Sequence, residues 1–318
     1  MKISVIVPTY CRPNDLERCL TALEKQNRVA DEVIVIVRDT DTATRTFLDA
    51  TLAEAKTLQL ITITVAGVIA AMNAGLEKAS GDVICFTDDD AAPHPSWLEQ
   101  IETHFKANPH LGGVGGRDLI QRNDPNLLQT RAVVGRLQWF GRTIGNHHLG
   151  AGTAREVDIL KGVNMSYRRL AIGDLRFDHR MLGSGAQVHF ELAFSLAIKR
   201  RGWKLIYDPN LLVDHYVAQR FDEDQRSQFN GLAYTNAVHN ETVALLDHFS
   251  WLQRFIFSLW SILIGTRQAL GLLQWIRLFP KLRTLATQQF VASWQGRKLG
   301  WATWRNSKLL STQHLRST

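Results

Sequence analysis

The sequence predicts an α/β fold, in which a doubly wound, mostly parallel sheet is followed by a helical C-terminal extension. Two observations predict the sheet: short β-rich runs alternate with helix-like spacing of leucines over the first hundred residues, and aspartates directly follow one of these runs. A third predicts the extension, because the chain has no acidic residue after Asp247. With 318 residues, 45% of them hydrophobic and 21% charged, the chain can bury a large core, which excludes disordered and collagen-like classes.

Four β-rich runs predict the first half of the sheet. They lie at residues 3–7, 33–37, 60–65 and 83–86. Helices between them are indicated by apolar residues at helical spacing, namely Leu16, Leu20 and Leu23, then Ile69, Met72, Leu76 and Ala79. In such sheets, ligands bind beyond the carboxyl ends of the strands, so polar residues after each run are candidates for a site.

The middle of the chain gives weaker signals. Residues 112–116 read Gly-Gly-Val-Gly-Gly, and we expect a turn between strands there, because no helix pattern follows as it would in a dinucleotide-binding loop. Residues 190–201 predict a helix that is closed by basic residues and Gly202. Two further strands are predicted at 203–207 and 211–214.

Three carboxylates, Asp88, Asp89 and Asp90, follow the run at 83–86. Neighbouring carboxylates repel one another, and a fold keeps them together mainly where a positive group binds. Mn²⁺ or Mg²⁺ takes oxygen ligands and often completes its shell with substrate phosphates. The triplet therefore predicts a site for a metal and a diphosphate. The structural alternative is that one aspartate caps the helix starting near Pro95 while the others are solvated.

Four segments together resemble the family 2 glycosyltransferases of the GT-A fold. They are residues 5–10 (VIVPTY), Asp39, residues 67–76 (GVIAAMNAGL) and residues 81–90 (GDVICFTDDD). The resemblance spans residues 1–216 and is closest to bacterial-type members. It implies a nucleotide-sugar-binding half at 1–118 and an acceptor-binding, catalytic half of the same domain at 119–220. It also implies an inverting, metal-dependent transferase.

The resemblance implies roles for individual residues. The nucleotide sugar would be bound by Pro8, Thr9, Tyr10, Asp39, Asn73, Asp88 and Asp89. A divalent cation, Mn²⁺ or Mg²⁺, would be held by Asp88, Asp90 and His215. A half-buried structural histidine stays an alternative for His215. Met72 and Arg38 depart from the family pattern, which leaves the choice between a UDP-sugar and a GDP-sugar open.

Glu191 occupies the position of the family's catalytic base, near the start of the helix that ends before Gly202. The usual pair there is Glu-Asp, whereas this chain has Phe190 and Glu191. His189 is an alternative that could share or replace the role, or simply cap the helix. A base at this position would take the proton of the acceptor hydroxyl. The sugar carbon would then be inverted without a covalent enzyme intermediate.

We predict a linker at 221–248 and a basic, tryptophan-rich, amphipathic tail at 249–318. The tail carries ten Lys or Arg residues and six of the nine tryptophans, which is typical of helices that lie at a membrane interface. Its longest uncharged stretch, 255–266, would cover only roughly 18 Å, too short to cross the hydrocarbon core. Two alternatives are packing on the catalytic domain or a second subunit, and nucleic-acid binding, which would leave an apolar run exposed.

The sequence thus predicts transfer of a sugar to a hydroxyl of a lipid-linked or polysaccharide acceptor, at the cytoplasmic face of a membrane. The N-terminal run is too short for a secretory signal, and three scattered cysteines suit a reducing compartment. We expect no nucleic-acid partner, and a homo-oligomer is left open. Two other functions remain: a catalytically weak sugar-nucleotide-binding or assembly subunit, and a nucleotidyltransferase.

Overall fold

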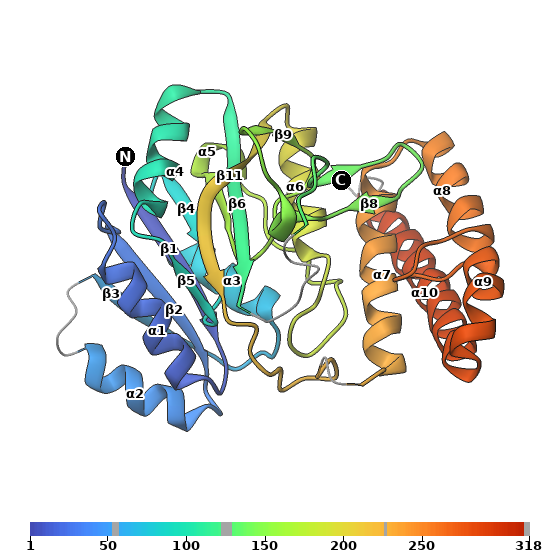
Figure 1. The fold of residues 1–318 in the computed structure, drawn as a ribbon, viewed down its shortest axis with the longest axis horizontal. Helices are drawn as coiled ribbons and strands as arrows, with labels where there is room; N and C mark the ends of the chain where they lie inside the picture. The colour runs from blue at the N-terminus through green and yellow to red at the C-terminus, as the bar shows by residue number, and fades with distance from the viewer. Residues whose placement is uncertain (53–56, 122–128, 226–227, 315–318) are drawn as a thin grey trace.

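The four β-rich runs of the N-terminal half form neighbouring parallel strands in one sheet. The computed structural model describes residues 1–318 apart from 53–56, 122–128, 226–227 and 315–318. The strands are β1 (Ile3–Thr9), β2 (Glu32–Arg38), β3 (Leu58–Ile63) and β4 (Val83–Phe86), in the order β3, β2, β1, β4. The predicted α/β class with a mostly parallel sheet is confirmed in this half (Figure 1).

Helices cover both faces of these strands because side chains alternate along each strand. In β1, Val5 and Val7 join a core shared with Leu16 and Trp97, whereas Ile6 joins the core shared with Met72. The covering helices are α1 (Pro13–Glu24), α2 (Thr42–Leu52), α3 (Val68–Lys78) and α4 (Trp97–Ala107). The strand ends that carry polar residues are thereby held between two packed layers.

The second half of the sheet mixes parallel and antiparallel pairs. Its strands are β5 (Ala91–Pro93), β6 (Leu111–Ile120), β9 (Arg155–Val157), β10 (Met165–Arg168) and β11 (Lys204–His215). Strand β10 lies antiparallel between β4 and β6, and β11 runs parallel to β6, so the described residues form a nine-stranded sheet. Shorter elements are the hairpin β7 (Arg136–Leu137) and β8 (Thr143–Ile144), η2 (His147–Leu149) and α5 (Arg169–Ile172).

The turn expected at residues 112–116 is wrong, because these residues lie inside the buried strand β6. Glycine is needed there for close packing. A Cβ on Gly112 would lie 2.4 Å from Cβ of Trp203, and one on Gly116 would lie 1.9 Å from the carbonyl oxygen of Leu211. The glycines therefore let neighbouring segments of the chain approach the strand closely. Because glycine has no side chain, the sequence lacks the apolar residues that would have predicted a strand there.

The two short strands predicted at 203–207 and 211–214 are one strand, β11, with an irregular register between Asp208 and Leu212. Its last residue, His215, pairs with Ala91 of β5. This pairing brings the C-terminal end of β11 beside the residues that follow β4.

An 18-residue helix, α7 (Gly231–His248), occupies most of the segment 221–248 that was predicted as a linker. Asn230 begins it by accepting hydrogen bonds from the backbone N–H groups of Leu232 and Ala233. The helix is buried around much of its surface, between α6 (Phe190–Arg200) and the C-terminal helices (Figure 1). Its buried residues include polar ones such as Asn240, so the sequence shows no single apolar stripe there.

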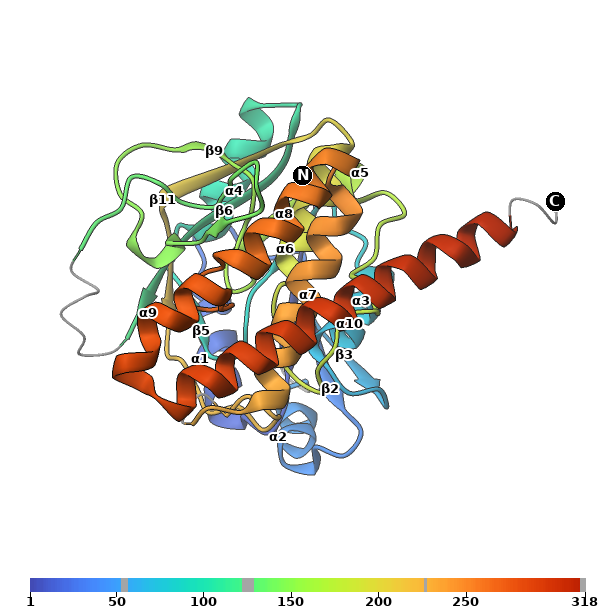
Figure 2. The ribbon, with the colours of Figure 1, turned by 90° about the vertical axis from the view of Figure 1, so that its right-hand side faces the viewer.

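The tail forms three helices, α8 (Trp251–Leu263), α9 (Leu272–Leu282) and α10 (Thr284–His314). Helix α10 crosses α7 closely, since a Cβ on Gly296 would lie 2.6 Å from the carbonyl oxygen of Thr235, and one on Gly300 would lie 2.6 Å from Cβ of Thr242. Figure 1 shows these helices together at the right-hand side of the molecule, and Figure 2, which views that side face on, shows α10 crossing α7. The alternative that the tail packs on the rest of the chain therefore holds for α10.

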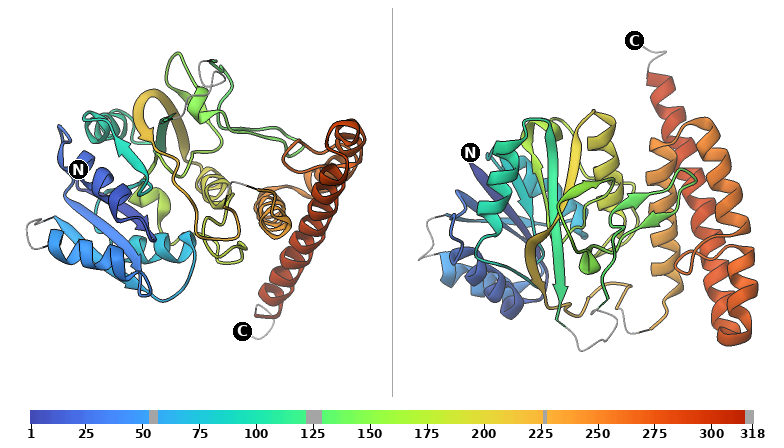
Figure 3. Two further views of the ribbon diagram at one scale, coloured as in Figure 1. Left: turned by 60° about the horizontal axis from the view of Figure 1, so that its bottom comes forward. Right: turned by 45° about the horizontal axis from the view of Figure 1, so that its top comes forward.

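Helices α8 and α9 present apolar side chains to solvent. Their exposed members are Trp251, Leu252, Phe255, Leu259, Ile262, Leu263, Leu272, Leu273, Ile276 and Phe279. The hairpin of β7 and β8 reaches from the sheet side to this layer (Figure 3). The Phe140 ring there contacts the Trp260 ring of α8. Among the helices in the described residues, none is long and apolar enough to traverse a bilayer. Of the tail's ten cations, Arg316 lies outside the described residues.

Candidate active site

A cavity of about 260 Å³ opens at the carboxyl ends of the adjacent strands β1 and β4. Eight of the eleven residues predicted for the site line it: Pro8, Thr9, Tyr10, Asp88, Asp89, Asp90, Glu191 and His215. The other three, Asp39, Asn73 and His189, are not among the described residues that line it. The fold therefore gathers most of the predicted site at the edge where a parallel sheet binds ligands.

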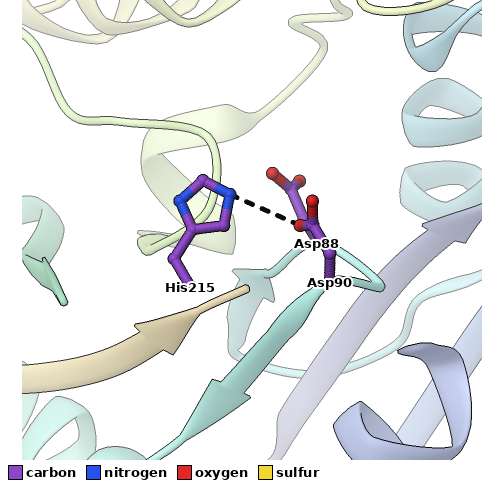
Figure 4. A group of neighbouring side chains, drawn as sticks. All are labelled: Asp88, Asp90 and His215. Carbon is purple, nitrogen blue, oxygen red and sulfur yellow. Dashed lines mark ion pairs between the residues drawn. The ribbon is translucent and has the colours of Figure 1, made fainter. Parts of the chain in front are cut away.

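Asp88, Asp90 and His215 form a compact cluster in this cavity (Figure 4). One ligand atom from each lies within 4.8 Å of the others. The aspartates come from the turn after β4, and the histidine ends β11. His215 Nε2 lies 3.5 Å from Oδ1 of Asp90, and the backbone N–H of Tyr216 donates to the carbonyl of Asp90. The pairing of β11 with β5 thus holds the imidazole against the carboxylates.

The electrostatics of the triplet depend on burial and on neighbouring charge. Burial raises the pKa of Asp88, and the carboxylate of Asp90 raises it further. Burial also raises the pKa of Asp89 to about 7, although Arg12 opposes the shift. For Asp90, the effect of burial is outweighed by His215 and by the N–H of Ala218, so its pKa is lowered. The cluster therefore concentrates carboxyl groups that a positive charge would stabilise.

The residues of the cluster fit a divalent cation. Oδ1 of Asp90 and Nε2 of His215 are buried and form an ion pair with each other at 3.5 Å, and neither makes a hydrogen bond within the described residues. Buried polar atoms normally make hydrogen bonds, so these two atoms are available to a cation that displaces the imidazole proton. Two carboxylates and one imidazole form a donor set that suits Mn²⁺, and the oxygen donors also suit Mg²⁺.

Two residues outside the cluster, Asp118 and Lys161, support His215 on the Nδ1 side of its imidazole. Asp118 is fully buried near the C-terminal end of β6, and its Oδ2 lies 3.5 Å from Nδ1 of His215. Asp118 also forms an ion pair with Lys161. Burial disfavours a charged imidazole, but Asp118 and Asp90 together raise the pKa of His215 to about 9. A carboxylate behind an imidazole fixes the ring's orientation. Neither Asp118 nor Lys161 lies in a segment with a sequence motif, so sequence reasoning missed both.

Arg12 is a further cavity residue that sequence reasoning missed. It lies in the turn between β1 and α1, and its Nη1 donates to Oδ1 of Asp89 at 2.8 Å. Its Nε and Nη2 donate to the carbonyl oxygen of Gln219. Thr9 also donates to Asp89, at 2.9 Å. The sequence did contain a signal for Arg12, because it is a basic residue three positions after Thr9 at the end of β1. A side chain at that position can reach the turn after the adjacent strand β4.

Glu191 lies in the first turn of α6 and lines the same cavity as the cluster. Its Oε2 atom is buried and has no hydrogen-bond partner among the described residues. His189 is the residue before the helix, with a left-handed backbone, and its side chain makes no capping hydrogen bond in the described part of the chain. Glu191 lines the cavity, whereas His189 is not among the described residues that line it.

Asp39 follows β2 and is partly exposed, with Oδ1 3.9 Å from Nε of Arg38. Arg38, which sequence reasoning treated only as a departure from a pattern, lines the cavity instead. Asp41 is the buried carboxylate of this turn. It accepts hydrogen bonds from the backbone N–H groups of Cys11 and Thr44, and so holds the turn after β1 to the start of α2.

Asn73 uses its amide within the fold. Its Nδ2 donates to the carbonyl oxygen of Phe177 at 2.9 Å, and its Oδ1 accepts from the N–H of the same residue at 2.8 Å. This pair of bonds ties helix α3 to the segment that leads toward α6. The side chain supports the wall of the site from a distance.

Residues 4–173, just over half of the chain, match the model of the family described as Glycosyl transferase family 2. The chain belongs to this family. This family 2 glycosyltransferase is therefore an enzyme that transfers a sugar from a nucleotide sugar. The nucleotidyltransferase interpretation is replaced by this assignment.

Two relatives of the glycosyltransferase come from Haloferax volcanii. Glycosyltransferase AglE is 27% identical over 266 residues, which cover 83% of this chain and 80% of the relative. Glucosyl-dolichyl phosphate glucuronosyltransferase is 25% identical over 181 residues, which cover 54% of this chain and 53% of the relative. The match to the second relative thus spans about half of its length.

Two solved structures show the same fold. S. aureus TarS 1-349 in complex with UDP-GlcNAc has a TM-score of 0.60 and 16% identity, covering 92% of this chain and 79% of the other. Mannosyltransferase PcManGT from Pyrobaculum calidifontis, in complex with GDP-Man and Mn²⁺, has a TM-score of 0.53 and 18% identity, covering 99% and 80%. The GT-A-like fold of this glycosyltransferase is thereby confirmed.

Proposed function

We propose that this enzyme is an inverting glycosyltransferase that moves a sugar from a UDP- or GDP-sugar to a hydroxyl of a lipid-linked or polysaccharide acceptor. One observation carries the proposal. Asp88, Asp90, His215 and Glu191 line one cavity at the carboxyl ends of the strands, and Oε2 of Glu191 has no hydrogen-bond partner among the described residues. A group that binds a diphosphate and a group that accepts a proton are both needed around a sugar carbon during transfer.

The donor would lie along the strand ends. Pro8, Thr9 and Tyr10 would contact the nucleotide, and Asp89, held by Arg12, would fix the turn beneath it. We keep Asp39 and Asn73 as outer supports of this subsite, because neither lines the cavity. Asp88, Asp90 and His215 would hold Mn²⁺ or Mg²⁺, which when bound supplies positive charge that neutralises the departing diphosphate.

Glu191 would act on the acceptor. Its free oxygen can take the proton of an acceptor hydroxyl as that oxygen attacks the sugar carbon. The base and the diphosphate-binding cluster are separate groups on one cavity, so attack from the side away from the leaving group would invert the carbon. His189 is the reserve assignment for this base, since it lies two residues away.

The tail would bring the enzyme to its acceptor. We propose that α8 and α9 lie flat on an anionic membrane, at its cytoplasmic face, with their exposed apolar side chains among the lipid headgroups. Residues 249–318 carry ten cations and no acid, so their charge is complementary to anionic lipid. A relative named as acting on a glucosyl-dolichyl phosphate supports a lipid-linked acceptor.

A thermal-shift screen tests the donor class. UDP, GDP, UDP-GlcNAc and GDP-mannose are each added with and without Mn²⁺, because a ligand that binds the native state raises the unfolding temperature. We expect stabilisation by one nucleotide series, and only with the metal. Turnover of the stabilising donor, with the anomeric configuration of the product followed by NMR, then tests inversion. Binding without any turnover would favour a sugar-nucleotide-binding subunit.

A further inference from the structure

Asn240, on α7, is fully buried, and its amide is bonded to a segment that leads into the active site. Its Nδ2 donates to the carbonyl oxygens of Leu182 and Val188, at 2.9 and 3.1 Å. Its Oδ1 accepts from the N–H of Leu182 at 2.7 Å. A side-chain amide has two N–H donors and one oxygen acceptor, and all of them are used here.

The segment that Asn240 holds has an unfavourable backbone. Gln187 and His189 both adopt positive φ values, 42° and 74°, which residues other than glycine rarely take. They flank Val188, whose carbonyl Asn240 binds, and Glu191 follows in the first turn of α6. Such conformations persist only where the surrounding structure fixes them in several ways.

The opposite side of the same segment is fastened to α3. The N–H of Val68 donates to the carbonyl oxygen of Gly185 at 2.8 Å, and the N–H of Ile69 donates to Oε1 of Gln187 at 3.1 Å. Gly185 and Val188 line the cavity. The backbone that precedes Glu191 is therefore held from two sides, by Asn240 of α7 and by the N-terminal residues of α3.

Helix α10 supports this arrangement from outside. His239 Nδ1 lies 2.9 Å from Oδ1 of Asn240, and its Nε2 lies 2.9 Å from Oγ1 of Thr303 on α10. Burial lowers the pKa of His239, which favours the neutral ring. Because Oδ1 of Asn240 is an acceptor, Nδ1 carries the proton and Nε2 accepts from the Thr303 hydroxyl. A chain of hydrogen bonds thus runs from α10 to the segment 182–188.

We propose that Asn240 is a positioning residue for Glu191, and that Thr303 and His239 orient Asn240 for this role. The inference rests on the proposed function, in which Glu191 is the base. Asn240 does not contact the cavity itself, so it acts only through the backbone that precedes α6. The C-terminal helices then contribute to the rate of transfer as well as to the fold.

A double-mutant cycle tests the proposal in the full chain, with release of UDP or GDP from UDP-GlcNAc and GDP-mannose as the assay. We expect Asn240→Ala to lower kcat on the order of 10- to 100-fold, the scale of a misplaced catalytic group, while the dissociation constant of the nucleotide with Mn²⁺ changes less than about twofold. Glu191→Gln and the double variant should be equally slow, because the effect of Asn240 passes through Glu191. Asn240→Asp, which keeps the shape but loses both donors, serves if the alanine variant fails to fold.

Hydrogen exchange gives a readout that needs no donor. Peptides covering 181–191 should exchange faster in Asn240→Ala, whereas those covering β1 should not change. Thr242→Val is the matched control, because Thr242 is equally buried on α7 and bonds Val238 and Arg297 instead. Unchanged exchange at 181–191, an unchanged kcat, or effects of Asn240→Ala and Glu191→Gln that multiply would each overturn the inference. Full activity of Glu191→Gln would instead overturn the base assignment, and this inference with it.

Discussion

Partly buried Arg12 and buried Asp89 form an ion pair that joins the turn after β1 to the turn after β4, with Nη1 of Arg12 2.8 Å from Oδ1 of Asp89. The same guanidinium lies 3.9 Å from Oδ2 of Asp90. It therefore balances part of the negative charge of the acidic triplet. The two strand ends that build the donor side of the cavity are held together by this one side chain and by Thr9.

Replacing Arg12 should weaken nucleotide binding. Arg12→Ala leaves the buried carboxyl of Asp89 without its cation, which destabilises the turn that Asp89 holds. We expect a lower unfolding temperature and weaker binding of UDP or GDP in the presence of Mn²⁺, both by calorimetry. Lys25→Ala, at the exposed end of α1, is the control. Equal affinities for the two variants would contradict this role of Arg12.

Asp90→Asn should abolish the dependence of nucleotide binding on metal. The substitution keeps the size of the side chain but removes one anionic ligand from the cluster with Asp88 and His215. Titration of UDP or GDP with and without Mn²⁺ measures the difference. Glu77→Gln, on the exposed side of α3, should behave as the unaltered protein. Undiminished metal dependence in Asp90→Asn would show that the cation is held elsewhere.

Glu191→Gln should leave donor binding intact and depress the rate, since glutamine keeps the shape but cannot accept the proton. General bases typically contribute about 10²–10⁴-fold, so a loss of this order in kcat is expected. The measurement is single-turnover transfer with the donor found by the thermal screen. If the rate is retained, the parallel variant His189→Gln decides whether the neighbouring imidazole is the base.

Arg297→Ala should destabilise the C-terminal helices. Arg297 of α10 and Glu241 of α7 form a buried pair at 2.6 Å, so the substitution leaves Glu241 buried and uncompensated. A loss of about 3–5 kcal/mol in the free energy of unfolding is expected, measured in urea. Lys298→Ala, the next residue on the exposed side of the helix, should change it by less than about 0.5 kcal/mol.

Charge on the outer faces of α8 and α9 should release the protein from membranes. Phe255 and Ile276 are more than half exposed, so glutamate at either position disturbs little packing but is repelled by an anionic surface. Sedimentation with vesicles containing phosphatidylserine measures binding. Val65→Glu, at a similarly exposed apolar position outside α8 and α9, is the control. Unchanged sedimentation of the α8 and α9 variants would show that these faces are not the membrane surface.

The strands of the first half and most of the site could be predicted because their signals are local. Runs such as 83–86 are β-rich and buried, and the aspartates follow directly, so strand and site appear in one stretch of sequence. Lys161, which lines the cavity, and Asp118, which lies behind His215, could not be found in this way. Each reaches the site through pairing of strands that are distant in sequence.

Two elements, β6 and α7, could not be predicted from the sequence because of how they pack. In β6, glycines replace the apolar side chains that mark a strand, because Trp203 and Leu211 fill their space. In α7, Asn240 and Glu241 are buried, so polar residues interrupt the apolar period that marks a packed helix. For Asn73, the sequence motif predicted a contact with the nucleotide. In the structure, its side-chain amide instead forms hydrogen bonds with the backbone of Phe177.

The close crossing of α7 and α10 limits how far this protein can be shortened. A chain ending at His248 would keep every residue of the cavity, yet it would expose Glu241 and the polar flank of α7 that α10 now covers. The smallest unit that retains the catalytic half intact therefore extends at least to Thr303. Variants that test the proposed membrane surface should therefore change the outer surfaces of α8 and α9 and leave the chain whole.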